Sequence, residues 1–274
     1  MEDLLPRGLM RPGAGVGSRG PAVSTGGGAY SPAEHGALAA WHDASDTDTI
    51  TVVADEMTAW ADKGPNGVDL IAPVVSRRPP YGAKTINSVV VPDFTGSPAQ
   101  GEVMWADTAT SHQILNASDG TVTFMAVCRL EDISDSNNII STDGESVTRG
   151  SIMRVNHRPE GLFFRTGEST IVHSQGSTFS DNAIGVATMV LTTSTVRTWW
   201  NNAGAAATSY TGAAAPTFAT GYALGGTAKA VPDGNLDGQI AEAIAWSEAL
   251  SDANRQAAER ILAVKWGLST TPWD

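Results

Sequence analysis

Residues 225–267 read GGTAKAVPDGNLDGQIAEAIAWSEALSDANRQAAERILAVKWG and contain the two clearest structural signals of the chain. The first is the run 239–246 (QIAEAIAW), in which Glu242 is the only charged residue. Such a run predicts a strand with one face buried and the other mostly covered. The second, from Ser251 onward, predicts a helix. The segment is therefore expected to form a buried strand, a short loop and one amphipathic helix.

The predicted helix has a recognisable beginning and end. Ser251 suits the N-cap, and Asp252 follows in the first turn, where exposed N–H groups favour a negative charge. Gly267 can close the helix in a left-handed conformation. Apolar residues recur between these ends at helical spacing: Ala253, Ala257, Ala258, Ile261, Leu262 and Trp266. Because almost no other helix is predicted, this one is expected to cover an end or an edge of a sheet structure.

The remainder of the chain is punctuated by turns at roughly ten-residue spacing, which is typical of a β-sandwich or jelly roll. With 274 residues, the chain is long enough to form one such domain. We predict an all-β fold, an antiparallel jelly-roll β-sandwich with a short C-terminal helix and an extended N-terminal arm. The run 122–130 (VTFMAVCRL) is almost continuously apolar and is expected to be central. The other predicted strands are 49–53, 88–91, 113–115, 139–141, 151–155, 161–165, 170–173, 187–192, 196–201 and 222–225, and residues 57–60 form another short apolar piece. Before them, residues 31–34 are expected to cap a short helical turn into residues 35–40.

Residues 1–30 differ from the rest of the chain. Eight glycines and three prolines fall between residues 1 and 28, and no apolar periodicity is visible. Such a segment cannot offset its ordering entropy alone, so it is either a disordered tail or an arm that docks on a partner. We favour a docking arm, with residues 31–274 as the jelly-roll domain. The predicted anchors are Leu4, Leu5, Leu9 and Met10, with Arg7 and Arg11 as polar clamps.

Composition argues against several functional classes. The net charge of −12 disfavours nucleic-acid binding, because phosphate contact needs clustered basic residues and only Arg77 and Arg78 adjoin. No apolar run reaches the ~20 residues of a membrane span. The first residues, MEDLLPRGLMRPG, lack the apolar region of a Sec signal peptide, so the protein is expected to stay where it is made. Cys128 is expected to be a small buried side chain.

Two groups of acidic residues could carry chemistry. Asp43, Asp46 and Asp48 form a loop that resembles a calcium site but lacks the glycine and the closing glutamate of an EF-hand. We favour a turn whose side chains bond the local backbone, with a calcium site of another type as the alternative. Glu131, Asp132 and Asp135 follow the end of a predicted strand and enter a turn. A glycosidase would carry its carboxylates on a rigid strand facing a cleft, which disfavours catalysis here.

The chain contains eight tryptophans. Trp41, Trp60, Trp199 and Trp246 lie in or beside strand-like runs and are expected in the core. Trp105, Trp200 and Trp273 have polar or terminal surroundings. Because exposed indole faces stack on sugar rings, Trp105 and Trp200 are candidate glycan-binding residues.

Two stretches resemble a known family. WHDASDTDTITV (41–52) with MTAWADKGPNG (57–67) is similar to the opening of concanavalin A-like, laminin-G-like jelly-roll domains, and 238–267 resembles their closing segment. Between them, ATMVLTTSTVRTWWNNAG (187–204) is a looser match, and Gly96-Ser97-Pro98 departs from the usual R-F-D-G. The closing match comprises Gly238, Ile240, Ala241, Glu242, Leu250, Ser251, Asp252, Arg255, Glu259, Leu262, Lys265, Trp266 and Gly267.

The resemblance implies the sandwich fold and leaves three functions open. Such domains bind glycans, bind protein surfaces or decorate particles, and they occur in secreted bacterial proteins and phage structural proteins. Our leading hypothesis is a non-enzymatic virion component, assembled in the host cytoplasm and held by its arm in many copies to a major capsid or tail protein. The alternatives are a lectin-like module that binds surface glycans and, third, a polysaccharide-degrading enzyme that uses Glu131 and Asp135. No cofactor other than calcium is expected.

Overall fold

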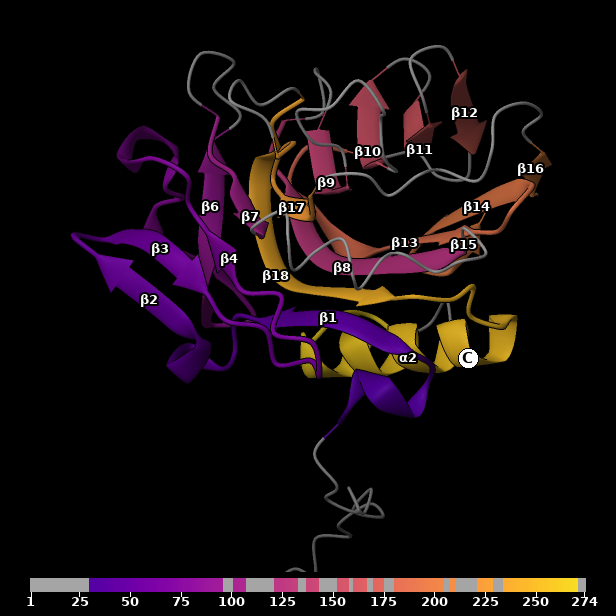
Figure 1. Ribbon diagram of the computed structural model, residues 1–274, viewed down its shortest axis with the longest axis horizontal. Helices are drawn as coiled ribbons and strands as arrows, with labels where there is room; N and C mark the ends of the chain where they lie inside the picture. The colour runs from indigo at the N-terminus through magenta and orange to yellow at the C-terminus, as the bar shows by residue number, and fades with distance from the viewer. Residues whose placement is uncertain are drawn as a thin grey trace, which may run out of the picture. The chain divides into compact units, whose positions relative to one another are not determined.

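The computed structural model describes residues 30–95, 101–106, 121–132, 137–142, 152–157, 160–166, 170–174, 180–204, 207–209, 221–228 and 234–270. The predicted arm, the predicted strand 113–115, Asp135 and Trp273 lie outside these residues. From Ser31 onward, the chain forms one compact unit. Its described residues form two antiparallel sheets that face each other and the α-helix α2 (Figure 1). The predicted all-β sandwich with a short C-terminal helix is confirmed.

The first sheet has the order β15-β14-β13-β8-β18-β6-β5, with β1 also on β18 and β16 also on β14. In the described part of the chain it contains β1 (Leu38–Asp43), β5 (Tyr81–Ile86), β6 (Val89–Thr95), β8 (Val122–Leu130), β13 (Ala183–Leu191), β14 (Thr195–Trp200), β15 (Ala203–Gly204), β16 (Thr208–Ser209) and β18 (Asp237–Trp246).

The second sheet has the order β12-β11-β10-β9-β17-β7-β4-β3-β2. Its described strands are β2 (Ile50–Val53), β3 (Glu56–Trp60), β4 (Leu70–Ile71), β7 (Met104–Ala106), β9 (Asn137–Ser141), β10 (Ile152–His157), β11 (Glu160–Thr166), β12 (Thr170–Ser174) and β17 (Ala223–Leu224). Three short 3-10 helices, η1 (Pro32–Glu34), η2 (Thr47–Thr49) and η3 (Val75–Arg77), lie in the N-terminal half.

Strands β8 and β18 form the centre of the first sheet. β8 is buried at every position but Arg129 and pairs with β13 and β18, as the apolar run predicted. β18 pairs with β8 along one side, while its other side is shared between β6 and β1. A bulge between Ile240 and Glu242 separates these two partners, and there the Ala241 carbonyl accepts a hydrogen bond from the Ala44 N–H at 2.9 Å.

The helix α2 (Asp252–Lys265) begins and ends as predicted. The Ser251 hydroxyl accepts a hydrogen bond from the Asn254 N–H, and Gly267 has a φ of +65°. Its position was predicted wrongly. Instead of covering an end or an edge, α2 lies against the outer face of the first sheet, where Trp266 contacts β18 and Asp252 contacts Arg197 of β14 (Figure 1). Side chains of β8 and β18 are buried on both faces of the first sheet. The outer face therefore needs the cover that α2 provides.

Two strand positions also differ from the expectation. Residues 38–40 belong to β1, where a continued helical turn was predicted, because β18 supplies a hydrogen-bonding partner that local sequence cannot show. Only the 3-10 turn η1 precedes it. Residues 81–86, which are not among the predicted strands, form β5, which pairs with β6. The core between and around the sheets is closed by large side chains that are almost fully buried, including Trp60, Trp246, Trp266, Tyr222, Phe94 and Phe124.

Candidate functional site

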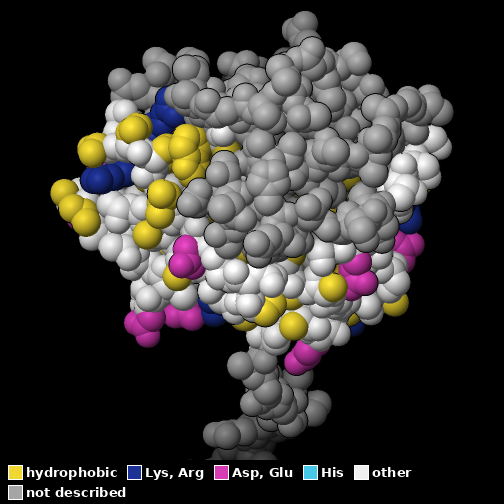
Figure 2. Space-filling model, in the orientation of Figure 1, with side chains coloured by type: hydrophobic (Ala, Val, Ile, Leu, Met, Phe, Trp, Pro, Cys, Tyr) yellow, Lys and Arg dark blue, Asp and Glu magenta, His cyan; other side chains and the backbone are white. Residues whose placement is uncertain are grey.

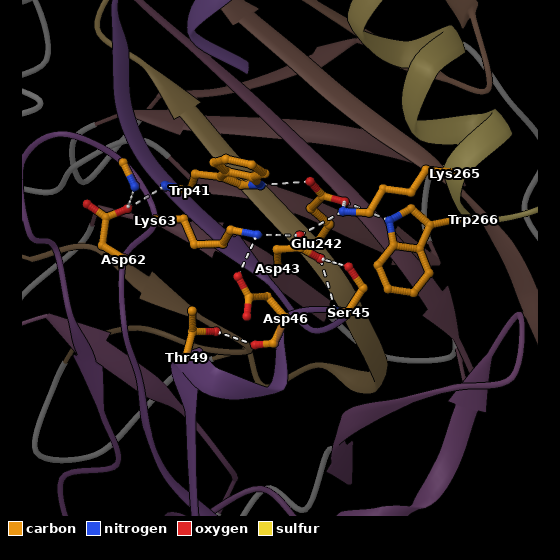
Figure 3. A network of polar contacts seen from close by, with 11 residues as sticks. Trp41, Asp43, Ser45, Asp46, Thr49, Asp62, Lys63, Glu242, Lys265 and Trp266 are labelled. Carbon is orange, nitrogen blue, oxygen red and sulfur yellow. Dashed lines mark hydrogen bonds and ion pairs between the residues drawn. The ribbon is translucent and has the colours of Figure 1, made fainter. Parts of the chain in front are cut away.

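A lysine–carboxylate network of Asp43, Asp46, Lys63, Glu242 and Lys265 joins the two stretches that resemble the family (Figure 3). The Lys63 ammonium lies 2.9 Å from a carboxylate oxygen of Asp43 and 2.9 Å from one of Asp46. Lys265, at the end of α2, lies 2.8 Å from Asp43 and 2.7 Å from Glu242. β1, the following loop, β18 and α2 are therefore held by one set of charges.

Glu242 is the buried centre of this network. Its side chain is fully buried, and its two oxygens accept hydrogen bonds from the Trp41 and Trp266 indole N–H groups, each at 2.7 Å. Lys265 supplies the third contact. Burial raises the pKa of Glu242, and the neighbouring Lys265 opposes that rise. Figure 3 shows the two indole rings approaching Glu242 from opposite sides.

Asp43 is stabilised in its charged form. Burial opposes its ionisation, but hydrogen bonds from Lys265 and Ser45 outweigh it and hold the pKa of Asp43 below its usual value. Both the backbone N–H and the hydroxyl of Ser45 donate to the same Asp43 oxygen, at 3.0 and 2.6 Å. The predicted local turn is thereby confirmed.

Two of the three calcium candidates are engaged by protein contacts. Asp43 and Asp46 share Lys63, while Asp48 lies in the short helix η2. Within the described ranges, no group of three or more His, Cys, Asp or Glu side chains is arranged to hold a metal ion. Because Asp43 contacts two lysines and Ser45, and Glu242 contacts two indoles and Lys265, the network acts as a structural connection between chain segments.

The two candidate glycan-binding tryptophans differ in exposure. Trp200 is only 8% exposed and offers no open indole face to a sugar ring. Trp105 is partly exposed and packs against a cluster that includes Val103 and Ala223, so it stays a candidate. Trp60, Trp199 and Trp246 are buried, as predicted, whereas Trp41 is half-buried with the Lys63 ammonium 4.3 Å from its ring centre.

In the structure, the second acidic group, at Glu131 and Asp132, includes neighbours that are distant in sequence. Glu131 pairs with Lys84 at 2.6 Å, and Asp237 of β18 lies close enough to Asp132 and Glu131 to be influenced by their charge. Burial, and then repulsion from Asp132 and Glu131, raises the pKa of Asp237 to about 6. The hydrogen bonds of Lys84 and Gln239 overcome the opposing effect of burial and lower the pKa of Glu131.

An open pocket lies at the tip of the β2–β3 hairpin. It has a volume of about 390 Å³ and is lined by Asp55, Pro80, Tyr81, Gly82 and Ala83. The start of β5 is attached to the hairpin, since the Tyr81 N–H donates to the Asp55 carbonyl at 2.8 Å. This pocket was not predicted from the sequence, where its one local signal is an aromatic residue followed by glycine, directly after two prolines.

The β2–β3 hairpin turns on two residues. Ala54 and Asp55 both have positive φ, at 54° and 63°, as do Asn87 and Ser88 in the β5–β6 loop. Positive φ at both central residues is what the favoured two-residue hairpin turn requires. Gly82 has a φ of +124°, and a Cβ placed on it would meet nothing within 4 Å. The pocket wall at Gly82 is therefore bare backbone that a ligand can approach closely.

Exposed hydrophobic side chains lie beside the pocket. The apolar patch consists of Val52, Val53, Ile71, Val74 and Val75, which are 40–62% exposed. Figure 2 shows hydrophobic side chains gathered with basic ones at the left, over the region of β2 and β3. β2, which carries Val52 and Val53 and leads into Asp55, stands at the end of the strand order of the second sheet.

No protein-family model and no curated protein matches the chain. Solved structures do. Domain 4 of AbnA, an extracellular GH43 arabinanase from Geobacillus stearothermophilus, has a TM-score of 0.53 at 11% identity, over 82% of this chain and 99% of that one. The binding domain of botulinum neurotoxin serotype D/C has a TM-score of 0.57 at 11% identity, over 87% and 56%. Trypanosoma rangeli sialidase has a TM-score of 0.54 at 10% identity, over 85% and 33%.

This chain thus spans about half of the toxin binding domain and a third of the sialidase. At such low identity, these likenesses establish the fold. They agree with the concanavalin A-like sandwich that the sequence resemblance implied.

Proposed function

We propose that this chain is a non-enzymatic carbohydrate-binding sandwich domain, displayed in many copies on a virion by its N-terminal arm. The observation that carries the binding function is the open pocket at the tip of the β2–β3 hairpin. It combines a carboxylate, an aromatic ring and exposed backbone within about 390 Å³, a volume in the usual range for small-ligand sites.

The chemistry of the pocket suits a sugar. The Asp55 carboxylate accepts hydrogen bonds from hydroxyl groups, and the half-exposed Tyr81 ring offers an apolar surface to the C–H groups of a pyranose or furanose. The open backbone at Gly82 leaves room for a ligand between them. Two neighbours support the same class of ligand: the arabinanase domain is in complex with arabinotriose, and a botulinum neurotoxin DC binding domain is in complex with SialylT.

A glycan array, run with and without calcium, tests the binding function. Wild-type protein should bind a subset of glycans, and Tyr81→Ala should weaken that binding at least tenfold, about 1.4 kcal/mol. Asp55→Asn should also weaken it. Asp48→Asn serves as the matched control, since Asp48 lies outside the pocket, and thermal unfolding verifies that each variant is folded. Absence of binding to every glycan under both conditions would contradict the proposal.

The virion location rests on residues 1–30. Their glycine and proline content, their apolar anchors and their charge of about +1 against −13 for the rest of the chain favour docking on an acidic or apolar partner, for which we propose a major capsid or tail protein. Many copies held by weak arms would gain attachment strength through avidity. Deleting residues 1–28 should leave a folded body that no longer joins particles; incorporation of the truncated protein would contradict this part alone.

The non-enzymatic part of the proposal concerns Glu131. Its carboxylate is engaged by Lys84, and the hydrogen bonds from Lys84 and Gln239 keep it ionised, whereas a general acid must hold a proton. Wild-type protein should therefore hydrolyse none of the common polysaccharides. Hydrolysis that is lost in Glu131→Gln would establish an enzyme instead.

A further inference from the structure

Three polar side chains meet in the core between the two sheets. His42 comes from β1 of the first sheet, while Trp60 of β3 and Tyr222, directly before β17, come from the second. All three are fully buried. The His42 ring stands edge-on to Trp60, with ring centres 5.6 Å apart, and lies nearly parallel to Tyr222, with ring centres 5.7 Å apart.

Each of these side chains has one polar atom without a partner. Across the part of the chain that the structure describes, the Trp60 indole N–H, the Tyr222 hydroxyl and His42 Nδ1 make no hydrogen bond. Buried polar groups are nearly always hydrogen-bonded, to protein or to ordered water. Because the Trp60 and Tyr222 rings both pack against His42, one shared partner can account for the three atoms.

The protonation of His42 follows from its contacts. Its Nε2 lies 2.9 Å from the Val68 carbonyl oxygen, which can only accept, so Nε2 carries the hydrogen. Burial lowers the pKa of His42 to about 4, against the opposing charges of Asp62 and Asp69, so the ring is neutral near pH 7. Nδ1 is consequently a bare acceptor.

These atoms set strict requirements on a shared ligand. The Trp60 N–H only donates, so the ligand must accept a hydrogen bond; His42 Nδ1 only accepts, so the ligand must also donate. A metal cation or an ammonium ion fails the first requirement, and a halide fails the second. Full burial of all three side chains demands a very small molecule.

We infer that His42, Trp60 and Tyr222 form an internal binding site for a structural water molecule that links the two sheets. The water accepts from Trp60 and donates to His42 Nδ1. The Tyr222 hydroxyl, which can do either, completes the usual set of about three hydrogen bonds. The nearby Asp62 does not compete, because its oxygens already accept from the N–H groups of Trp41, Gly64 and Val68.

Water–protein cross-relaxation NMR on the full chain tests this site. The Trp60 indole proton should show a cross-peak to water with the negative NOE sign of a long-lived contact. The Trp246 indole, equally buried but bonded to the Pro32 carbonyl at 3.0 Å, provides the control in the same spectrum and should show none. Absence of the Trp60 cross-peak would overturn the inference.

One variant separates bound water from exchange through the tyrosine hydroxyl. In Tyr222→Phe, a water held by Trp60 and His42 should still give the cross-peak, whereas a signal relayed through the Tyr222 hydroxyl should vanish. Loss of the signal in the folded variant would overturn the inference. If Tyr222→Phe does not fold, a high-resolution crystal structure of the wild type decides: density within hydrogen-bonding distance of Trp60 Nε1 and His42 Nδ1 supports the site, and its absence overturns it.

Discussion

The Lys265 ammonium lies 2.8 Å from the Asp43 carboxylate, which joins the last turn of α2 to the end of β1. Both residues belong to stretches that resemble the concanavalin A-like family, one near each end of the domain. Their contact explains why both stretches carry charged residues at buried positions. The residues that carry the resemblance therefore make contacts that hold the domain together, while the candidate binding pocket lies elsewhere.

Removing the charge of Lys265 should destabilise the protein strongly. Lys265→Met leaves the buried Glu242 without its ammonium partner Lys265, and breaking a buried ion pair costs on the order of 3 kcal/mol. Lys84→Met is the matched control, since the Lys84–Glu131 pair is more exposed and should contribute less than about 1 kcal/mol. Urea unfolding measures both. Equal losses would contradict the structural role of the network, and adding Glu242→Gln to Lys265→Met should recover part of the loss.

Gly238 should tolerate no side chain. It lies in β18 with a φ of +152°, and a Cβ there would collide with the backbone carbonyl of Arg129 in β8. We expect Gly238→Ala to cost about 3 kcal/mol, from backbone strain and from displacement of the central strand pair. Gly67→Ala, at a φ of +65° with nothing within 4 Å of the new Cβ, should cost only about 1 kcal/mol. Similar unfolding free energies for the two variants would show that β8 and β18 move apart without cost to accommodate the new Cβ at position 238.

His42 should make the protein sensitive to acid. Its pKa falls from 6.5 in the unfolded chain to about 4 in the fold, because burial disfavours the charged ring. The unfolded chain therefore binds a proton that the folded protein excludes. The contribution of neutral His42 to the free energy of unfolding is complete above pH 6.5 and is lost as the pH falls toward 4. Between pH 7 and pH 5, the free energy of unfolding should fall by about 2 kcal/mol.

The titration itself can be followed by NMR of the histidine rings. The His42 resonance, assigned by its absence in His42→Gln, should show a neutral ring down to about pH 4. A midpoint near 6.5 would contradict the buried, neutral state of His42.

Asp237 should act in the opposite direction. Burial and the charges of Asp132 and Glu131 raise its pKa to about 6, so the fold retains a proton that the unfolded chain releases near pH 3.8. The stabilisation that comes from this retained proton weakens as the pH rises from about 4 to 6. At pH 7, Asp237→Asn should raise the unfolding free energy by up to about 1 kcal/mol, a modest gain because solvent screens the partly exposed site. Asp48→Asn is the control, and an equal gain in both would show that net charge alone is responsible.

The sequence predicts those elements whose signals are local. The apolar run 122–130 became β8, and the Ser251 cap and Gly267 delimit α2, because apolar periodicity and capping act over a few residues. β1 was missed because its pairing depends on β18, which is distant in sequence. The docking of α2 on the sheet face was missed for the same reason: the position of a helix depends on which sheet surface is left uncovered.

The candidate sites were less predictable. Asp43 and Glu242 were visible as motif residues, but their neutralisation by Lys63 and Lys265 arises only when four chain segments meet. The pocket depends on the two-residue turn at Asp55 and on β5 beside it, neither of which has a periodic signal. Trp200 appeared polar in sequence because asparagines follow it, yet its strand buries the indole.

β6 and β1 pair with different parts of the same edge of β18, and this arrangement has a consequence for biosynthesis. β1 pairs with no strand other than β18 among the residues that the structure describes, so its backbone can find no sheet partner until residues 237–246 have left the ribosome. The aromatic and charged residues around β1 must remain solvated, or shielded by chaperones, throughout most of translation. Pairing across so long a separation is slow, which predicts that the domain completes its folding after synthesis of β18 rather than during elongation.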